Sequence, residues 1–264
     1  MKKLTVLLLV LVLALVSACT AKEDAPAPET HLQETEITVA AAASLTDVTK
    51  ELAEKYNETN PNVKIVFTYA SSGALQTQIE EGAPIDVFIS AAKKQMTELN
   101  DKDLIAPGTA KDLLKNQIVL IVPADSDLDI SGFADCDGDA IKIIAFGDPK
   151  TTPAGQYAQD VFEKLGIWDD VNAKANFASD VRQVLTYVES GDVDCGVVFK
   201  TDAMTSDKVK VIAPPPAAVD SPAIYPVGII AGSSNLTESQ KFVDFLFTEE
   251  AKVIFEDFGF ETVK

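Results

Sequence analysis

The chain has very little of the side-chain chemistry on which most hydrolases and metalloproteins depend. It contains one histidine among 264 residues, His31, which lies in a segment near the N-terminus rich in Ala, Pro, Glu and Thr. The patterned part of the chain after that segment therefore has no histidine, the commonest general base and a frequent metal ligand. We expect a protein that is not an enzyme and that has no cofactor.

Motifs of nucleotide and ester hydrolysis are also missing. The sequence has no Gly-x-x-x-x-Gly-Lys-Ser/Thr phosphate loop, so any ATP hydrolysis would belong to a partner chain. It has no Gly-x-Ser-x-Gly nucleophile elbow and no clustered carboxylate metal motif. These absences count against an extracellular enzyme acting on phosphorylated or sulfated substrates, which stays as an alternative.

Positive charge is scarce. The 22 Lys and Arg face 41 Asp and Glu, which gives a formal net charge of −19. Loss of the two charges of Lys2 and Lys3 with an export signal would make it −21. This charge argues against nucleic acid as a partner. It also repels anions at long range, so a bound anion would need short-range hydrogen bonds.

Long apolar runs occur only at the N-terminus. Lys2 and Lys3 precede the apolar run Leu4 to Val16, which is too short for a stable membrane span. The run ends in Val16-Ser17-Ala18-Cys19, which resembles a bacterial lipobox. We expect residues 1–18 to be a lipoprotein signal peptide and Cys19 to be lipidated. Residues 19–35 would be a disordered tether that anchors an extracytoplasmic protein to the membrane.

Two cysteines remain after Cys19. Cys136 and Cys195 could form a disulfide outside the membrane, or stay as two free thiols. Their spacing matches no metal site. Both states remain open from the sequence.

Strand-like and helix-like segments alternate, which predicts an α/β fold with helices flanking parallel sheets. Two strands, 118–122 and 223–231, are expected to carry the chain between two lobes. The expected strands are 36–41, 63–69, 86–89, 118–122, 141–146, 196–199, 208–213 and 223–231. The expected helices are 45–56, 73–81, 93–99, 110–114, 157–165, 181–188, 237–247 and 249–258.

Four turns stand at predicted helix starts with few charges beside them. A helix N-terminus exposes unpaired N–H groups and suits an oxyanion. Ser44 with Asp47 three residues later fits a capping box, Pro153 suits a first helical turn, and Ser179 is expected to cap its helix. The turns are 43–46, 70–73, 152–155 and 178–181.

The turns contain no lysine, and only the last has an arginine beside it, Arg182. We interpret Arg182 as the partner of a carboxylate such as Asp180 or Glu189 rather than as an anion ligand. The turns therefore predict a small anion held by neutral donors, which favours binding over catalysis.

Several motifs together resemble the periplasmic molybdate-binding proteins of ABC importers, in order and over nearly everything from Ile37 onward. The motifs are Ala41-Ala42-Ala43-Ser44-Leu45-Thr46, Ala70-Ser71-Ser72-Gly73, Asp86-Val87-Phe88-Ile89-Ser90-Ala91, Gly147-Asp148-Pro149, Pro153-Ala154-Gly155, Asp180-Val181-Arg182, Thr201-Asp202-Ala203, Tyr225-Pro226-Val227 and Phe258-Gly259-Phe260. The resemblance implies a type II periplasmic-binding-protein fold, with two α/β lobes joined by crossover strands and a ligand cleft between them.

The resemblance also implies a binding site for molybdate or tungstate. Ser44 and Ser72 would each offer a hydroxyl and an N–H, and Ala154 and Val181 an N–H each, so that the metal is held only through its oxygens. The family's fifth position is usually a tyrosine, and here it is Phe199. One hydrogen bond to the anion is therefore missing, worth about 1.5–3 kcal/mol if nothing replaces it.

The same resemblance implies the organisation and partners of the chain. Lobe I would comprise residues 36–117 with 224–264, and lobe II residues 118–223. The protein would be a monomer that delivers its ligand to the transmembrane subunits of an ABC permease with a separate ATPase. Within this class, Phe199 favours a second candidate, a receptor for sulfate or another tetrahedral oxyanion. A subunit that senses the ligand and signals without transport is a further alternative.

Overall fold

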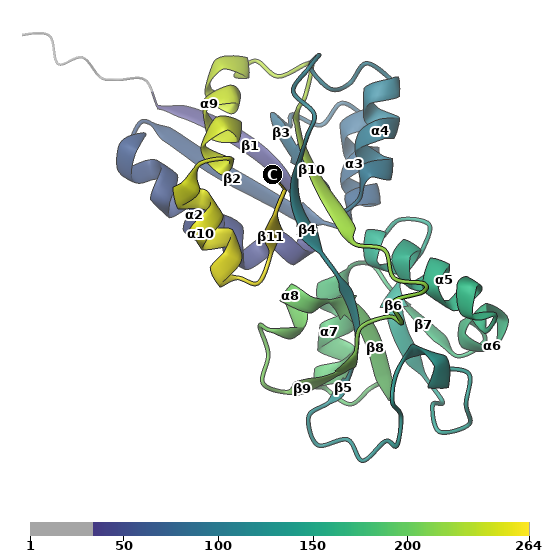
Figure 1. Ribbon diagram of the computed structural model, residues 1–264. Coiled ribbons are helices and arrows are strands. Elements are labelled where there is room, and N and C mark those ends of the chain that lie inside the picture. Colours follow the sequence, from purple (N-terminus) through teal and green to yellow (C-terminus); the bar gives the residue numbers. More distant parts are fainter. Residues whose placement is uncertain (1–33, 264) are drawn as a thin grey trace, which may run out of the picture. The chain divides into compact units, whose positions relative to one another are not determined.

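The computed structural model describes residues 34 to 263 and arranges them around two β-sheets (Figure 1). The first sheet has six strands in the order β11-β4-β10-β3-β1-β2, and the second has five in the order β7-β6-β8-β5-β9. The predicted alternation of strands and helices is confirmed over most of this length.

Most predicted segments correspond to an element, whereas the elements at 133–135, 168–172, 175–178, 200–203 and 261–262 were not predicted. The strands are β1 Thr35–Ala42, β2 Val63–Ala70, β3 Val87–Ile89, β4 Lys111–Asn116, β5 Ile118–Pro123, β6 Ile144–Gly147, β7 Ala175–Ala178, β8 Cys195–Phe199, β9 Val209–Ala213, β10 Ala223–Ile229 and β11 Glu261–Thr262. The helices are η1 Ala43–Leu45, α2 Thr46–Thr59, α3 Ser72–Glu80, α4 Lys93–Asp101, η2 Phe133–Asp135, α5 Pro153–Leu165, α6 Trp168–Asn172, α7 Val181–Glu189, α8 Lys200–Ala203, α9 Leu236–Leu246 and α10 Glu249–Asp257.

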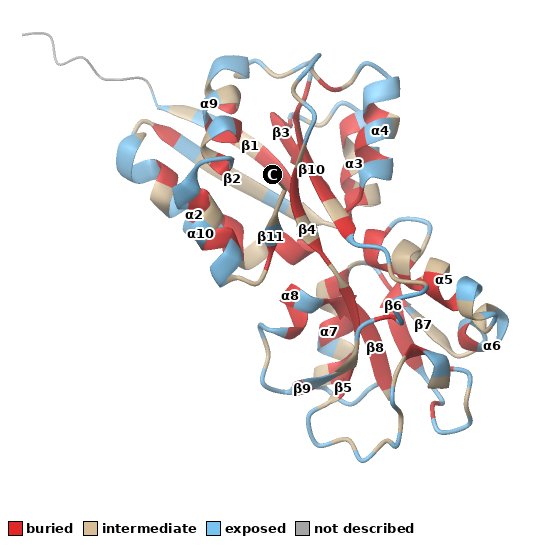
Figure 2. Ribbon diagram, in the orientation of Figure 1, coloured by how far each residue is buried: buried red, intermediate tan, exposed pale blue. Residues whose placement is uncertain are grey.

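Helices cover both faces of the first sheet. In β1 successive side chains point to opposite faces, so Val39 joins the apolar cluster that holds Leu52 of α2 and Phe242 of α9. Its neighbour Ala40 joins the cluster that holds Leu75 of α3. Burial on both faces suits the apolar second half of β1, residues 39–42, which is buried throughout, and Figure 2 colours the central strands of this sheet largely as buried.

The second sheet is built in the same way from later parts of the chain. Strand β6 pairs parallel to β7 and β8, while β5 pairs antiparallel to β8 and β9. The ring of Phe146 in β6 lies 6.0 Å from that of Phe162 in α5 and 5.3 Å from that of Phe177 in β7. An aromatic cluster therefore anchors α5, whose first turn carries the predicted Ala154.

The chain passes between the two sheets twice. Strand β4 ends at Asn116 and β5 begins at Ile118, so Gln117 alone separates them. The chain returns through residues 214–222, between β9 and β10. The Gln117 side-chain amide donates to Asp220 at 2.6 Å, which ties the two passages together.

One predicted helix is wrong. Residues 110–114 were expected to be helical, but Lys111–Asn116 form strand β4, which pairs antiparallel to β10 on one side and β11 on the other. Leu113 and Leu114 are both buried between those neighbours. Pairing with strands more than a hundred residues later overrides the local pattern, which is too short to set a period.

The N-terminal predictions lie mostly outside the described residues. The signal peptide and Cys19 precede residue 34, so they stay predictions. Thr35, placed at the end of the tether by the sequence, is the first residue of β1. Within residues 34–263, no helix has the length and apolarity needed to cross a bilayer.

The start of α5 depends on Gly155. A Cβ on this residue would overlap the carbonyl oxygen of Gly147 at the end of β6. We therefore expect Gly155→Ala to lower the free energy of unfolding by about 2 kcal/mol through overpacking. Gly232→Ala is the control, because an added Cβ there meets no heavy atom within 4 Å. Chemical denaturation of both variants tests this, and equal stabilities would contradict it.

Candidate functional site

A small cavity collects the four predicted helix-start turns. Its volume is about 10 Å³, close to the space that a single water-sized sphere needs. Its lining residues come from both sheets and their helices, and Asp180 alone among them is charged. They are Ala42, Ala43, Ser44, Ala70, Ser71, Ser72, Ala91, Thr152, Pro153, Ala154, Asp180, Val181 and Phe199.

All five sequence-predicted binding residues line this cavity: Ser44, Ser72, Ala154, Val181 and Phe199. Contact with an anion stays a prediction for each of them. The backbone also approaches across the cavity's edge, where the Gly73 N–H of α3 donates to the Thr151 carbonyl before α5 at 2.9 Å. A Cβ on Gly73 would overlap that carbonyl, so glycine is required for this close approach.

Ser44 does not cap a helix. It lies within η1, and the N-cap of α2 is Leu45, which makes no side-chain cap. The predicted capping box is therefore wrong, because a turn of 3-10 helix moves the start of α2 past Ser44. The Ser44 Oγ lies 3.0 Å from the Tyr225 hydroxyl instead.

Ser72 is fully buried at the start of α3. Its Oγ accepts a hydrogen bond from the Ala91 N–H at 2.9 Å, just beyond β3. With an N–H donating to the oxygen, the hydroxyl hydrogen of Ser72 is available to another acceptor. The residue before it, Ser71, takes the N-cap position without a side-chain cap bond.

The third turn behaves as predicted, with Pro153 at the first helical position and Thr152 as N-cap. The fourth does not, because Asp180 caps α7 in place of Ser179. The Asp180 carboxylate accepts from the N–H groups of Arg182 and Gln183 at 2.9 and 3.0 Å. A carboxylate is a stronger acceptor than a hydroxyl, and this geometry leaves the first N–H of α7, that of Val181, without an intrahelical partner.

Phe199 forms part of the cavity wall at the end of β8 and is 1% exposed. Its ring packs edge-on against Tyr225, with centroids 5.5 Å apart, and against Tyr157 at 6.4 Å. The ring offers no hydrogen-bond donor, so the cavity lacks a side-chain donor at this point.

Comparison with known proteins settles what kind of chain this is. Residues 37–261 match the model of a family described as bacterial extracellular solute-binding protein. The chain belongs to this family. Two relatives agree with it: YvgL of Bacillus subtilis, whose name describes a substrate-binding lipoprotein of an ABC transporter, and the molybdate-binding protein ModA of Haemophilus influenzae. YvgL is 39% identical over 93% of each chain, and ModA is 40% identical over 85% of this chain and 89% of its own.

These relatives confirm the resemblance that the motifs indicated, and the two-lobed type II fold is confirmed with it. The sulfate-binding protein SubI of Mycobacterium tuberculosis superposes with a TM-score of 0.79 over 87% of this chain and 88% of its own, at 16% identity. At that identity the likeness shows the fold alone. The choice of anion therefore has to come from the residues of the cavity.

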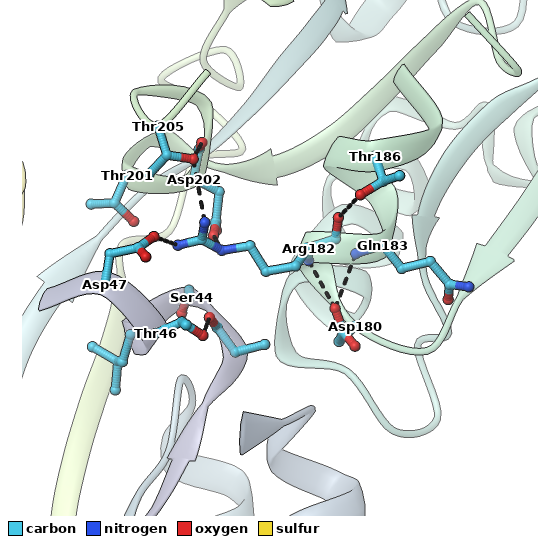
Figure 3. Close-up of polar contacts among 12 residues, drawn as sticks. Ser44, Thr46, Asp47, Asp180, Arg182, Gln183, Thr186, Thr201, Asp202 and Thr205 are labelled. Carbon is cyan, nitrogen blue, oxygen red and sulfur yellow. Dashed lines mark hydrogen bonds and ion pairs between the residues drawn. The ribbon is translucent and has the colours of Figure 1, made fainter. Parts of the chain in front are cut away.

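Arg182 pairs with carboxylates, as the sequence predicted, but its partners are Asp47 and Asp202 rather than Asp180 or Glu189. Figure 3 shows its guanidinium between Asp47 of α2 and Asp202 of α8, with ion-pair distances of 2.8 Å to each. Asp180 is occupied as the cap of α7. The pair with Asp47 joins the helix after Ser44 to the helix that starts at Val181, so it fastens the two sides of the cavity.

An open groove of about 650 Å³ runs past this ion pair and is lined by both acidic and basic side chains. It does not include the serines or the turns. The smaller cavity gathers the unpaired donors of the predicted turns, and it is therefore the candidate binding site. In the part of the chain that the structure covers, no group of His, Cys, Asp and Glu has a metal-binding arrangement.

Cys136 and Cys195 are both buried and not disulfide-bonded. A hydrogen bond from the neighbouring Cys136 and burial together raise the pKa of the Cys195 thiol far above its usual range. Both cysteines left open by the sequence are therefore free thiols, and the raised pKa makes Cys195 unreactive at neutral pH.

Two residues behind the cavity were not predicted from the sequence. Tyr225 and Asn116 are buried, and the Asn116 amide donates to the Tyr225 hydroxyl at 3.2 Å. Tyr225 belonged to a recognised motif, but its contact with Ser44 spans 181 positions and has no local signal.

Asp202 should make stability depend on pH. Burial raises its pKa to about 7, against the opposing effect of Arg182, whereas an unfolded aspartate titrates near 3.9. The folded state thus holds an extra proton between these values, and the free energy of unfolding falls as pH rises from about 4 to about 7, by at most about 1.4 kcal/mol per pH unit.

Asp202→Asn removes this titration, so the variant should gain stability relative to the wild type across the same range. Chemical denaturation at several pH values measures the difference. Glu249→Gln, at a side chain that is 89% exposed, controls for the loss of one acid. A wild-type-to-variant difference that is constant with pH would contradict the assignment.

Proposed function

We propose that this chain is a lipid-anchored receptor outside the membrane that captures molybdate or tungstate and delivers it to an ABC permease. The observation that carries the proposal is the convergence of Ser44, Ser72, Ala154 and Val181 on one small cavity. The names of the relatives support it, since ModA of Haemophilus influenzae is a molybdate-binding protein.

Neutral donors suit a fully deprotonated oxyanion. A buried dianion is costly unless its lone pairs are hydrogen-bonded, and fixed N–H and O–H groups satisfy them without a counter-charge. A protonated anion would place its own O–H against a donor and be rejected. Molybdate and tungstate are deprotonated near neutral pH, whereas phosphate is partly protonated. Sulfate is also deprotonated but smaller, so its exclusion would have to come from the size of the cavity around the bound anion.

The ligand would lie between lobe I, residues 36–117 with 224–264, and lobe II, residues 118–223. Closure of the lobes would be held by the contact of Gly73 with Thr151 and by the pair of Asp47 with Arg182. The transported anion would pass to permease subunits driven by a separate ATPase, with the receptor acting as a monomer held by lipidated Cys19.

A sulfate receptor is the second candidate, because Phe199 removes a donor from the cavity wall. An enzyme is disfavoured by the lack of histidine after His31, and no catalytic function is proposed.

Calorimetric titration of the purified chain tests the proposal. We expect submicromolar binding of molybdate and tungstate, little response to sulfate, and one site per chain. A preference for sulfate would move the assignment to the second candidate. Failure to bind any tetrahedral oxyanion would overturn the proposal.

The serines provide a prediction about the site itself. Ser44→Ala and Ser72→Ala should each weaken molybdate binding about tenfold or more, because each removes a donor to a charged ligand. Removal of the Ser72 hydroxyl leaves the buried Ala91 N–H without its acceptor, so the free energy of unfolding without ligand should fall as well, by about 1–3 kcal/mol. Thr109→Ala, remote from the cavity, is the control for loss of a hydroxyl that also accepts from a backbone N–H. Unchanged molybdate affinity in variants that remain folded would mean that the serines serve the fold.

Phe199→Tyr restores the donor that the family usually has. If the cavity is otherwise family-like, molybdate affinity should stay the same or rise by up to about tenfold. Titration of the variant beside the wild type measures this. A loss greater than tenfold would show that the cavity wall has been rebuilt around the phenylalanine.

A further inference from the structure

Tyr225 lies directly behind Ser44 and contributes to no helix cap or ion pair. It belongs to β10, is fully buried, and packs its ring against Phe199 and Phe260 with centroids 5.5 and 5.7 Å away. Its hydroxyl has two neighbours, the Ser44 Oγ at 3.0 Å and the Asn116 Nδ2 at 3.2 Å. Tyr225 itself does not line the cavity.

The direction of these hydrogen bonds is set by Asn116. Its Oδ1 accepts from the Gln117 N–H at 2.9 Å, which turns the amide nitrogen toward Thr201 and Tyr225. An amide NH₂ only donates, so the Tyr225 oxygen is an acceptor from Asn116. The single hydrogen of the Tyr225 hydroxyl is then left for the Ser44 oxygen.

The consequence falls on Ser44. Its oxygen accepts from Tyr225, so its own hydrogen is directed to another acceptor, and the residue lines the cavity. Ser72 is in the same condition, because its oxygen accepts from the Ala91 N–H. Both serines are thereby held as donors. Ser72 is held by the Ala91 N–H, and Ser44 is held by the hydrogen-bonded side chains of Tyr225 and Asn116.

Tyr225 keeps its proton at every physiological pH. Burial, with the nearby Asp202 as a second cause, raises the pKa of its phenol well above the usual value. Hydrogen bonds in such a chain also polarise one another, which strengthens the last donor in the series.

We propose that Tyr225, oriented by Asn116, is a specificity-determining positioning residue that holds Ser44 as an obligatory donor to the bound oxyanion. The arrangement rests on the proposed function. It makes up part of the donor strength that Phe199 does not supply, and it makes the cavity reject anions that carry an O–H.

Tyr225→Phe removes the hydroxyl and keeps the ring that packs against Phe199. Titration of the full chain with sodium molybdate should show about a tenfold loss of affinity. In a Ser44→Ala background the same change should cost less than about twofold, whereas in a Ser72→Ala background it should cost the full tenfold. Non-additivity with Ser44 alone is the signature of action through that serine.

The second measurement is the ratio of the affinities for molybdate and hydrogen phosphate at mildly alkaline pH. In Tyr225→Phe the Ser44 oxygen is free to accept a hydrogen bond from the O–H of hydrogen phosphate. Binding of hydrogen phosphate should therefore weaken less than binding of molybdate, or should strengthen. Tyr157→Phe is the matched control: it removes a second phenol beside Phe199 whose hydroxyl faces the backbone of Ile224 rather than a serine. It should leave molybdate affinity within about twofold.

Two results would overturn the proposal: unchanged molybdate affinity in Tyr225→Phe, or an equal loss in the wild-type and Ser44→Ala backgrounds. Denaturation without ligand shows whether each variant folds. If the wild-type chain binds no molybdate, the proposed function fails instead, so the two failures are distinguishable.

Discussion

Helix N-termini leave N–H groups without partners, and in this chain several of them are brought to one cavity by two separate sheets. Each sheet delivers its helix starts at the ends of strands: α3 after β2 in the first, and α5 and α7 after β6 and β7 in the second. The cavity is complete only when both sheets contribute, because Ser44 and Ser72 belong to one part and Ala154 and Val181 to the other. A ligand held there would contact residues carried by both sheets.

The electrostatics of the site depend on the ion pairs of Arg182, which lies beside the cavity. The net charge of −19 repels anions, and a free cation in the cavity would offset that repulsion without regard to the anion's protonation. Arg182 instead lies between Asp47 and Asp202, so its charge is already compensated. What remains for the ligand is a set of neutral donors, which respond to the position and protonation of each ligand oxygen.

The sequence was sufficient for the elements with a clear period and for residues within a single turn. The helical face of α2 and the proline at the start of α5 were predicted correctly, because each depends on neighbours within a few positions. Errors occurred where distant pairing decided the outcome. Residues 110–114 became strand β4 through β10 and β11, and Ser44 turned from a cap into a partner of Tyr225. Arg182 found Asp47 and Asp202 rather than the acids near it in the chain.

Phe199 and Tyr225 show why a single missing donor does not decide the function of such a site. A tyrosine at position 199 would place a hydroxyl on the cavity wall. Tyr225 does not line the cavity; its hydroxyl contacts Ser44, which does, and its ring packs against Phe199. A donor at the wall adds one bond to the ligand. Under the proposal, a donor behind Ser44 fixes the direction of the Ser44 hydroxyl, so it would act on which anions are accepted as well as on how tightly they bind. The amide of Asn116, held by the Gln117 N–H at the passage between the sheets, supplies that direction. The passage between the two sheets thus carries the amide that orients the Tyr225 hydroxyl toward Ser44.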